Sequence, residues 1–235
     1  MNTPAKVFVY SFISGTAIII GGFLGTKKIP DKVLAFILTF GSGVILAVLS
    51  FTLMHEAYNH SGPIITSIAF ILGGLFFYEL EVLLEKKFTE GIGITLGTAM
   101  DDLPEALSMG IGFASKENLG IILALSIFLH NIPEGLSSTS DLIDSSNFSR
   151  KKALLLSILL GLLTPFWALV GYYFLRNIPE MWLGIIMAFS GGAVLFMTGT
   201  DMIPKAHRIG NRAVNIGILF GFLIAFLLTK VFGLN

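Results

Sequence analysis

The chain contains one motif twice, in GTAMDDLPEALSMGIGF at residues 97–113 and in FLHNIPEGLSSTSD at residues 128–141. Aligned with each other, DDLPEA at 101–106 and HNIPEG at 130–135 each contain two polar residues, an apolar residue, a proline, a glutamate and a small residue. Both copies lie inside strongly apolar segments, and ionisable side chains are costly at membrane depth. The pattern therefore predicts a functional site that faces the interior of a helix bundle.

The composition is that of an integral membrane protein, and we expect a single transmembrane transporter domain over residues 1–235. Of the 235 residues, 54% are hydrophobic and 13% are charged, whereas a soluble domain carries about 25% charged residues. The chain has no cysteine, so neither a disulfide framework nor a thiolate metal site is available. Its net charge of zero argues against nucleic acid as a partner.

The apolar segments predict an all-α bundle of eight transmembrane helices, because each helix that crosses a bilayer needs roughly 20 apolar residues. The first segment continues too far for a cleaved signal peptide, so we read it as the first membrane helix. The connections are short. The predicted spans are residues 5–26, 33–57, 63–84, 92–114, 119–142, 152–174, 180–202 and 212–232.

The distribution of lysine and arginine predicts the orientation of the bundle in a plasma membrane. Eleven of the 15 basic residues lie in the loops after the first, third, fifth and seventh predicted helices or close to them. Cytoplasmic loops carry an excess of Lys and Arg. We therefore expect both termini to be extracytoplasmic, as an even number of helices requires.

A second internal similarity relates the second and seventh predicted helices. Residues 40–46 read FGSGVIL, and residues 189–195 read FSGGAVL. In the predicted topology the two helices cross the membrane in opposite directions, which is typical of inverted repeats in secondary transporters. Small residues also recur in membrane helices simply because they allow close packing. The sequence leaves both interpretations open.

The two proline motifs together supply the side chains of a cation site. In each motif the two polar residues lie over the helix face that carries the glutamate, because positions i, i+3 and i+4 share a face. Each proline also frees the carbonyl group four residues earlier, at Met100 and Leu129. Imidazole with carboxylate suits Zn, Fe and Mn and disfavours Cu(I). The predicted ligands are Asp101, Asp102, Glu105, His130, Asn131 and Glu134.

Three other interpretations compete with a metal site. A Pro-Glu pair in one membrane helix is compatible with a purely structural kink, although two copies in frame favour a function. The same carboxylates would also serve a proton- or sodium-coupled carrier of another solute. An intramembrane metallohydrolase is disfavoured because the chain lacks the His-Glu-x-x-His pattern, so we do not expect an enzyme.

The residues quoted above resemble the ZIP (Zrt-/Irt-like) divalent-metal transporters. DDLPEA at 101–106 and HNIPEG at 130–135 are similar to that family's paired motifs on the fourth and fifth helices. The resemblance extends over nearly the whole chain, which looks like a divergent, prokaryotic-type member of the family. It implies an inverted 3+2+3 arrangement of helices and uptake of metal toward the cytoplasm, with zinc as the first substrate and Mn, Fe and Cd as alternatives.

The same resemblance implies two neighbouring metal subsites bridged by the two glutamates. The first subsite would consist of Asp101, Glu105, His130 and Glu134. The second would consist of Asp102, Glu105, Asn131 and Glu134. The expected partners are the metal ion and the lipid bilayer, and a homodimer is compatible with the sequence.

The sequence departs from the family pattern in three places. The first motif begins with Asp-Asp and ends with Pro-Glu-Ala, where His-Asn and Pro-Glu-Gly are usual. Thr164 precedes Pro165 where a glutamate is common, so the second subsite loses a carboxylate. The loop after the third predicted helix has no histidine. A site dominated by oxygen ligands in this way also favours Mn or Fe.

Four further residues are candidates along a path to or from the site. His55 and Glu56 fall near the outer end of the second predicted helix, where they would either guide ions inward or cap the helix. Asp201 is an acid at the inner end of the seventh predicted helix, in Asp-Met-Ile-Pro at 201–204, and is a candidate exit ligand. Thr164, which precedes Pro165, is the fourth candidate.

Overall fold

The computed structural model describes residues 2–87, 90–144 and 148–231, and every regular element in these ranges is a helix. Two π-helical turns, Leu49–Leu53 and Thr198–Met202, and one 3-10 turn, Arg212–Asn215, join longer α-helices. The α-helices are α1 Thr3–Gly25, α2 Asp31–Val48, α3 Met54–Lys87, α4 Glu90–Ser115, α5 Glu117–Asp144, α6 Arg150–Leu175, α7 Glu180–Met197, α8 Ile203–Ile209 and α9 Ile216–Val231.

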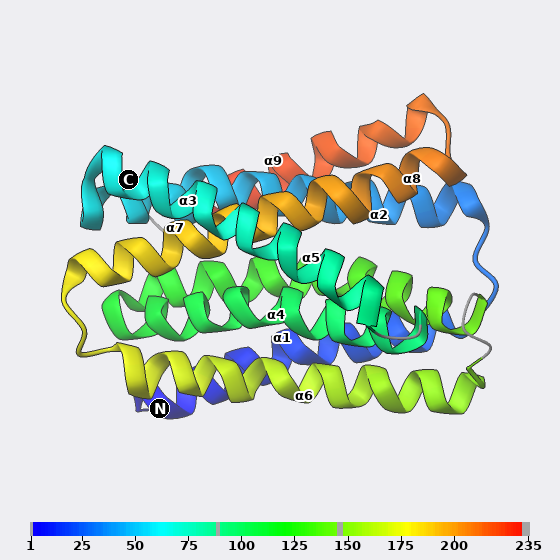
Figure 1. Cartoon of the computed structure of the whole chain (residues 1–235), viewed down its shortest axis with the longest axis horizontal. Coiled ribbons are helices and arrows are strands. Elements are labelled where there is room, and N and C mark those ends of the chain that lie inside the picture. The colour runs from blue at the N-terminus through cyan, green and yellow to red at the C-terminus, as the bar shows by residue number, and fades with distance from the viewer. Residues whose placement is uncertain (1, 88–89, 145–147, 232–235) are drawn as a thin grey trace.

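The helices lie side by side along the long axis of the molecule, and the chain runs back and forth between the two ends of the bundle (Figure 1). The start of α1 and the end of α9 lie at the same end, on the left of Figure 1. Large apolar side chains on the outer helix faces are exposed, for example Ile64 on α3 and Leu219 on α9. Such outward-facing apolar surfaces fit contact with lipid.

Six continuous helical stretches within the described residues are long and apolar enough to cross a membrane. The second of them, Asp31–Leu84, is 54 residues long, far longer than a single crossing requires. It turns at Gly62, whose φ of 71° is readily adopted only by glycine. Pro63 follows and has no N–H to continue the helical hydrogen bonds. The stretches are Thr3–Gly25, Asp31–Leu84, Glu117–Asp144, Arg150–Leu175, Glu180–Ile209 and Arg212–Val231.

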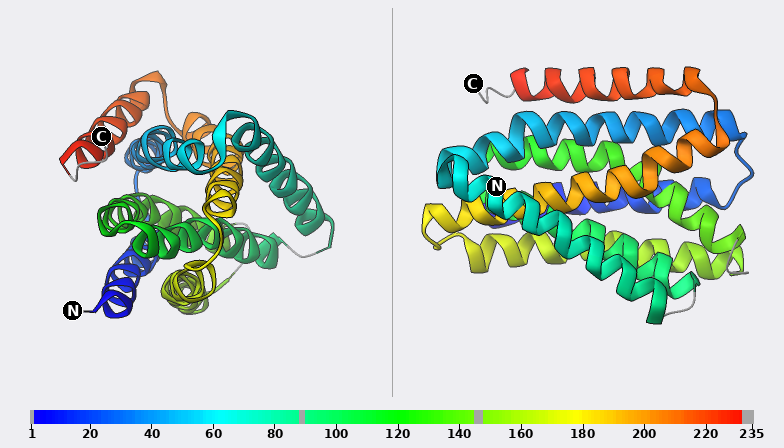
Figure 2. Two further views of the ribbon diagram at one scale, coloured as in Figure 1. Left: turned by 90° about the vertical axis from the view of Figure 1, so that its left-hand side faces the viewer. Right: turned by 45° about the horizontal axis from the view of Figure 1, so that its top comes forward.

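The helices form two packed groups, which the end-on view separates (Figure 2). In one group, α3 packs mainly on α7, and α2 packs mainly on α9. In the other, α1 packs on α5 and α6, and α4 packs on α5 and α6. The groups meet where α2 contacts α5 and α4 contacts α7. Both proline motifs therefore lie at the boundary between the groups.

Helix bounds differ from the expected spans in two places. The span predicted to end at residue 57 continues to the turn at Gly62, because no residue before it breaks the helix. The span predicted for 180–202 continues through the π-helical turn and α8 to Ile209. Pro204 does not stop it, because it lies in the first turn of α8, where a missing N–H costs little.

Features of α2 recur in α7 at positions 149 residues later. Pro30 and Pro179 precede the two helices, and the π-helical turns begin at Leu49 and Thr198. Close helix contacts repeat as well. A β-carbon at Gly43 would lie 2.2 Å from the carbonyl oxygen of Ile218, and one at Gly192 would lie 1.9 Å from that of Phe70. Only glycine permits these approaches, so the sequence similarity of the two helices corresponds to similar packing.

Candidate metal centre

The two proline motifs lie on adjacent helices. The turn at Lys116 separates α4 from α5, and the two helices pack against each other. Pro104 lies inside α4 and Pro133 inside α5. The ring of Pro133 packs against α2 at Gly41, where a β-carbon would lie 2.5 Å from its Cγ. Helix α2 therefore contacts the second motif directly.

His130 and Glu105 bring the two motifs together in the interior. The imidazole Nε2 lies 2.5 Å from Oε2 of Glu105, and Nδ1 lies 2.9 Å from the carbonyl oxygen of Ser126. A carbonyl oxygen only accepts hydrogen bonds, so Nδ1 carries a proton and donates it to Ser126. This contact fixes the ring and directs Nε2 toward Glu105. Histidines that bind metal ions are commonly oriented by a hydrogen bond of this kind.

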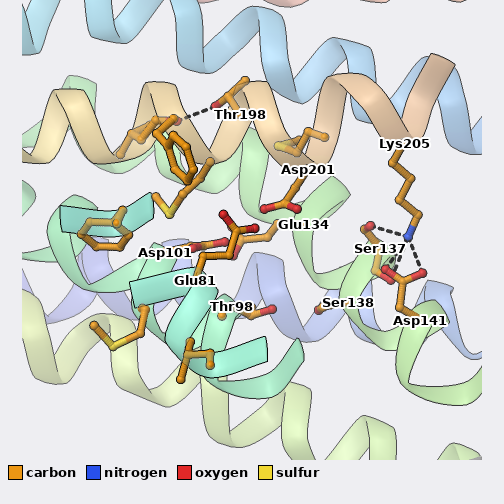
Figure 3. Close-up of a pocket in the computed structure, with 18 of the residues that line it drawn as sticks. Glu81, Thr98, Asp101, Glu134, Ser137, Ser138, Asp141, Thr198, Asp201 and Lys205 are labelled. Carbon is orange, nitrogen blue, oxygen red and sulfur yellow. Dashed lines mark hydrogen bonds and ion pairs between the residues drawn. The ribbon is translucent and has the colours of Figure 1, made fainter. Parts of the chain in front are cut away.

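A cavity of about 480 Å³ borders the motifs on one side and is lined by three of their four acidic side chains. Asp101, Glu105 and Glu134 line it, together with Glu81 of α3 and Asp201. Figure 3 shows the carboxyl groups of Glu81, Asp101, Glu134 and Asp201 directed toward one another. Asp201 is exposed although it lies in a helix that could span a membrane. The cavity is therefore accessible to water and can accept a cation.

Asp102 and Asn131 lie outside the cavity lining and are buried. Thr164 on α6 donates a hydrogen bond of 2.9 Å to Oδ1 of Asp102. The amide of Asn131 donates to the carbonyl oxygen of Ser14 at 3.5 Å. Among the described residues, Oδ2 of Asp102, Oδ1 of Asn131 and Oε1 of Glu134 are buried and have no hydrogen-bond partner. Of the six predicted ligands, Asp101, Glu105 and Glu134 thus line the cavity, whereas Asp102 and Asn131 are buried outside it.

The predicted ligands do not all converge on one point. Within the described parts of the chain, no group of three or more His, Cys, Asp or Glu side chains is arranged to hold a metal ion. Asp101 and Glu134 meet in the cavity, whereas His130 borders a separate void of about 20 Å³, and Glu105 borders both. Apolar side chains enclose that void, including Leu53.

Glu56 belongs to a buried ionic cluster, whereas His55 does not. Glu56 is 2% exposed, and both of its carboxylate oxygens accept hydrogen bonds of 3.1 Å from Lys116. His60 lies between Glu56, at 3.6 Å, and Glu180, at 3.8 Å. His55 is exposed. At this end of the bundle, the glutamate of the predicted pair faces inward and the histidine faces outward.

Several residues near the cavity were not predicted as part of the site. Glu81 lines it, and so do Asp141 and Lys205 toward the end of the bundle (Figure 3). Asp141 was identifiable in principle, because it lies seven residues after Glu134 and so shares its helix face. Glu81 and Lys205 lie on other helices, and helical spacing does not reveal which of their faces meets α5.

Comparison with known proteins agrees with the repeated motif. The family model described as ZIP Zinc transporter matches residues 84–229. The chain is 31% identical over 251 residues to the zinc transporter GufA of Myxococcus xanthus, across 96% of this chain and 98% of that protein. It is 27% identical to the zinc transporter ZupT of Akkermansia muciniphila, across 93% and 94% of the two chains. It is 26% identical to ZupT of Clostridium perfringens, across 95% of both. The chain belongs to the ZIP zinc transporter family.

Proposed function

We propose that this protein carries divalent transition-metal cations across a membrane. Zinc is the substrate we expect, and Mn, Fe and Cd are further candidates. Relatives that match nearly its whole length are named zinc transporters. The carboxylates and imidazole of the two proline motifs suit these ions. It is a multi-pass membrane protein and a transporter rather than an enzyme. The plasma membrane is the location we propose, and a homodimer stays a prediction.

The metal is held between α4 and α5 by Asp101, Glu105, His130 and Glu134. The observation that carries this assignment is the geometry of His130. Its Nδ1 donates to the carbonyl oxygen of Ser126, so Nε2 is free of that role and faces Glu105. The two motif glutamates both line the water-accessible cavity. Glu105 links the four side chains, because it contacts His130 and lines the same cavity as Asp101 and Glu134.

Asp102 and Asn131 form a second, weaker subsite at most. A hydroxyl from Thr164 already occupies one oxygen of Asp102, and a threonine supplies no negative charge to a second divalent ion. The unpartnered oxygens of Asp102 and Asn131 remain the groups that would serve it. We therefore propose that one ion, bound on the cavity side, is the transported species.

The arrangement that we propose for the bundle is eight membrane crossings in an inverted 3+2+3 order. The features that recur 149 positions apart in α2 and α7 support it, as do the matching contacts of Gly43 and Gly192. Both termini are then extracytoplasmic, and the cavity opens toward the cytoplasmic end, where most lysines and arginines lie. Transport would proceed by movement of one helix group against the other.

The experiment that tests the function is zinc uptake into proteoliposomes by Glu105→Gln and Glu134→Gln. Loss of an outer-shell partner of a bound metal costs roughly 10–100-fold, so loss of a ligand carboxylate should reduce uptake by at least that factor. Glu79→Gln is the matched control, because Glu79 is exposed on α3. Full uptake by either motif variant would contradict the site. Uptake of another solute that is unaffected by chelators, and that stops when a proton or sodium gradient is removed, would instead indicate a coupled carrier.

A further inference from the structure

Lys205 on α8 is bound to α5 at the end of the cavity (Figure 3). Its ammonium group lies 2.6 Å from each carboxylate oxygen of Asp141 and 2.7 Å from the hydroxyl of Ser137. The lysine side chain is 16% exposed and that of Asp141 is 40% exposed. A charge-assisted contact of this length, from a largely buried lysine, is among the stronger polar interactions in proteins. The pair therefore holds one defined position at the mouth of the cavity.

The contact lies on the route that a cation takes from the proposed centre to the end of the bundle. Glu134, Ser137, Ser138 and Asp141 all line the cavity, and their spacing places them along one face of α5. A cation that leaves Glu134 toward this end therefore passes the serine hydroxyls and reaches Asp141. Lys205 borders the same cavity, so the ion meets an ammonium group there.

The carboxylates along this route create a difficulty for release. Glu81, Asp101, Glu105, Glu134 and Asp201 line the cavity in addition to Asp141. Oxygen ligands such as these bind Mn and related divalent ions, and an ion that is bound too firmly at the last position leaves slowly. Conduction requires binding strong enough to enter and weak enough to leave. A resident positive charge at the last carboxylate removes this obstacle.

We propose that Lys205 is a tethered cation that occupies Asp141 and thereby prevents the exit end of the cavity from holding the metal. This role rests on the proposed transport function. Lys205 acts through Asp141 and does not bind the metal, so it is a positioning residue that sets the rate of release. The substrate remains the divalent cation that the proposed centre carries.

The opposite end of the bundle contains the same device with its charges exchanged. Glu56 lies 149 positions before Lys205, at the separation that relates α2 to α7, and it is neutralised by Lys116 from the turn between α4 and α5. At each end, one lysine therefore pairs with one carboxylate across the boundary between the two helix groups. This recurrence supports a role in transport for the Lys205 pair, beyond a chance surface contact.

The test uses full-length protein with Lys205→Met, Lys205→Arg and the double variant Lys205→Met/Asp141→Asn. Lys151→Met is the control, because Lys151 is exposed at the same end of the bundle. Bound Cd²⁺ per chain is measured by native mass spectrometry after desalting. Initial zinc uptake is measured in proteoliposomes over a range of zinc concentrations, with monodispersity checked for each variant.

Lys205→Met should retain about one additional Cd²⁺ per chain. Slower release should lower kcat and KM by the same factor, roughly tenfold for each 1.4 kcal/mol of added retention, and leave kcat/KM unchanged. Lys205→Arg and the double variant should match the wild type in both measurements, as should the control. Unchanged Cd²⁺ content, a fall in kcat/KM or a failure of Asp141→Asn to restore release would overturn the proposal. Absence of metal uptake by the wild type would instead refute the transport function itself.

Discussion

Thr164 determines how Asp102 is held, and it lies at the position where the family resemblance anticipates a glutamate. Its hydroxyl donates a hydrogen bond of 2.9 Å to a carboxylate oxygen that is otherwise enclosed. A buried acceptor that loses its donor bears the full cost of its desolvation. The threonine therefore holds Asp102 by a neutral hydrogen bond, at a position where the resemblance implies another carboxylate.

Thr164→Val should lower the stability of the protein, because it keeps the shape of the side chain and removes the donor to Asp102. The expected loss is about 1–3 kcal/mol in the free energy of unfolding. Thermal unfolding in detergent, with Thr164→Ser as the control that retains the hydroxyl, measures it. An unchanged midpoint for the valine variant would show that Asp102 does not depend on this bond.

The candidate ligands can be named from the sequence, but their distribution in the bundle cannot. Helical spacing places both Asp101 and Asp102 over the face of Glu105, yet Asp101 lines the cavity while Asp102 meets Thr164. Adjacent residues on a helix point about 100° apart, and only the neighbouring helices decide which direction is a cavity. Glu81 carried no signal for the same reason.

The helices themselves follow from apolar length and from the residues that interrupt it. Gly62 and Pro63 divide the longest stretch, and this turn is visible in the sequence. The π-helical turns at Leu49–Leu53 and Thr198–Met202 have no comparable signal, because a π-bulge depends on packing around the helix and is frequently functional. Their equal placement relative to the FGSG and FSGG segments nevertheless supports the repeat that those segments indicated.

Gly192→Ala should separate α7 from α3. A β-carbon at this position would lie 1.9 Å from the carbonyl oxygen of Phe70, and backbone cannot move aside as a flexible side chain can. Over-packing of this kind typically costs roughly 1–3 kcal/mol, so the thermal midpoint should fall. Gly199→Ala is the control, because a β-carbon there meets nothing within 4 Å. Equal midpoints for the two variants would mean that α3 and α7 do not pack as closely as described.

At the scale of the molecule, the proposed centre is open on one side and closed on the other. The cavity leads from Glu105 and Glu134 to Lys205 and Arg208. Apolar side chains of α2 and α5, such as Val48 and Ile127, enclose the opposite side of Glu105 and His130. Beyond them lies the contact between Glu56 and Lys116, which joins the two helix groups. If transport proceeds by the proposed movement of one helix group against the other, access from the other side requires this contact to separate.

Holding residues 56 and 116 together should therefore stop transport. The chain has no cysteine, so Glu56→Cys/Lys116→Cys carries only the two introduced thiols, which a short bifunctional methanethiosulfonate can join. Uptake by this variant should fall at least roughly tenfold on cross-linking, as it would if a state open at the Glu56 end became more than about 1.4 kcal/mol less favourable. A reductant should restore uptake. Each variant serves as its own reference before treatment, and the single variants, treated in the same way, report any effect of modification alone.

Since a fixed link leaves helix packing within each group intact, a loss of uptake would trace to relative movement of the groups. Full uptake by protein whose cross-link is verified by mass spectrometry would place the movement elsewhere and leave the Glu56–Lys116 pair as a static contact.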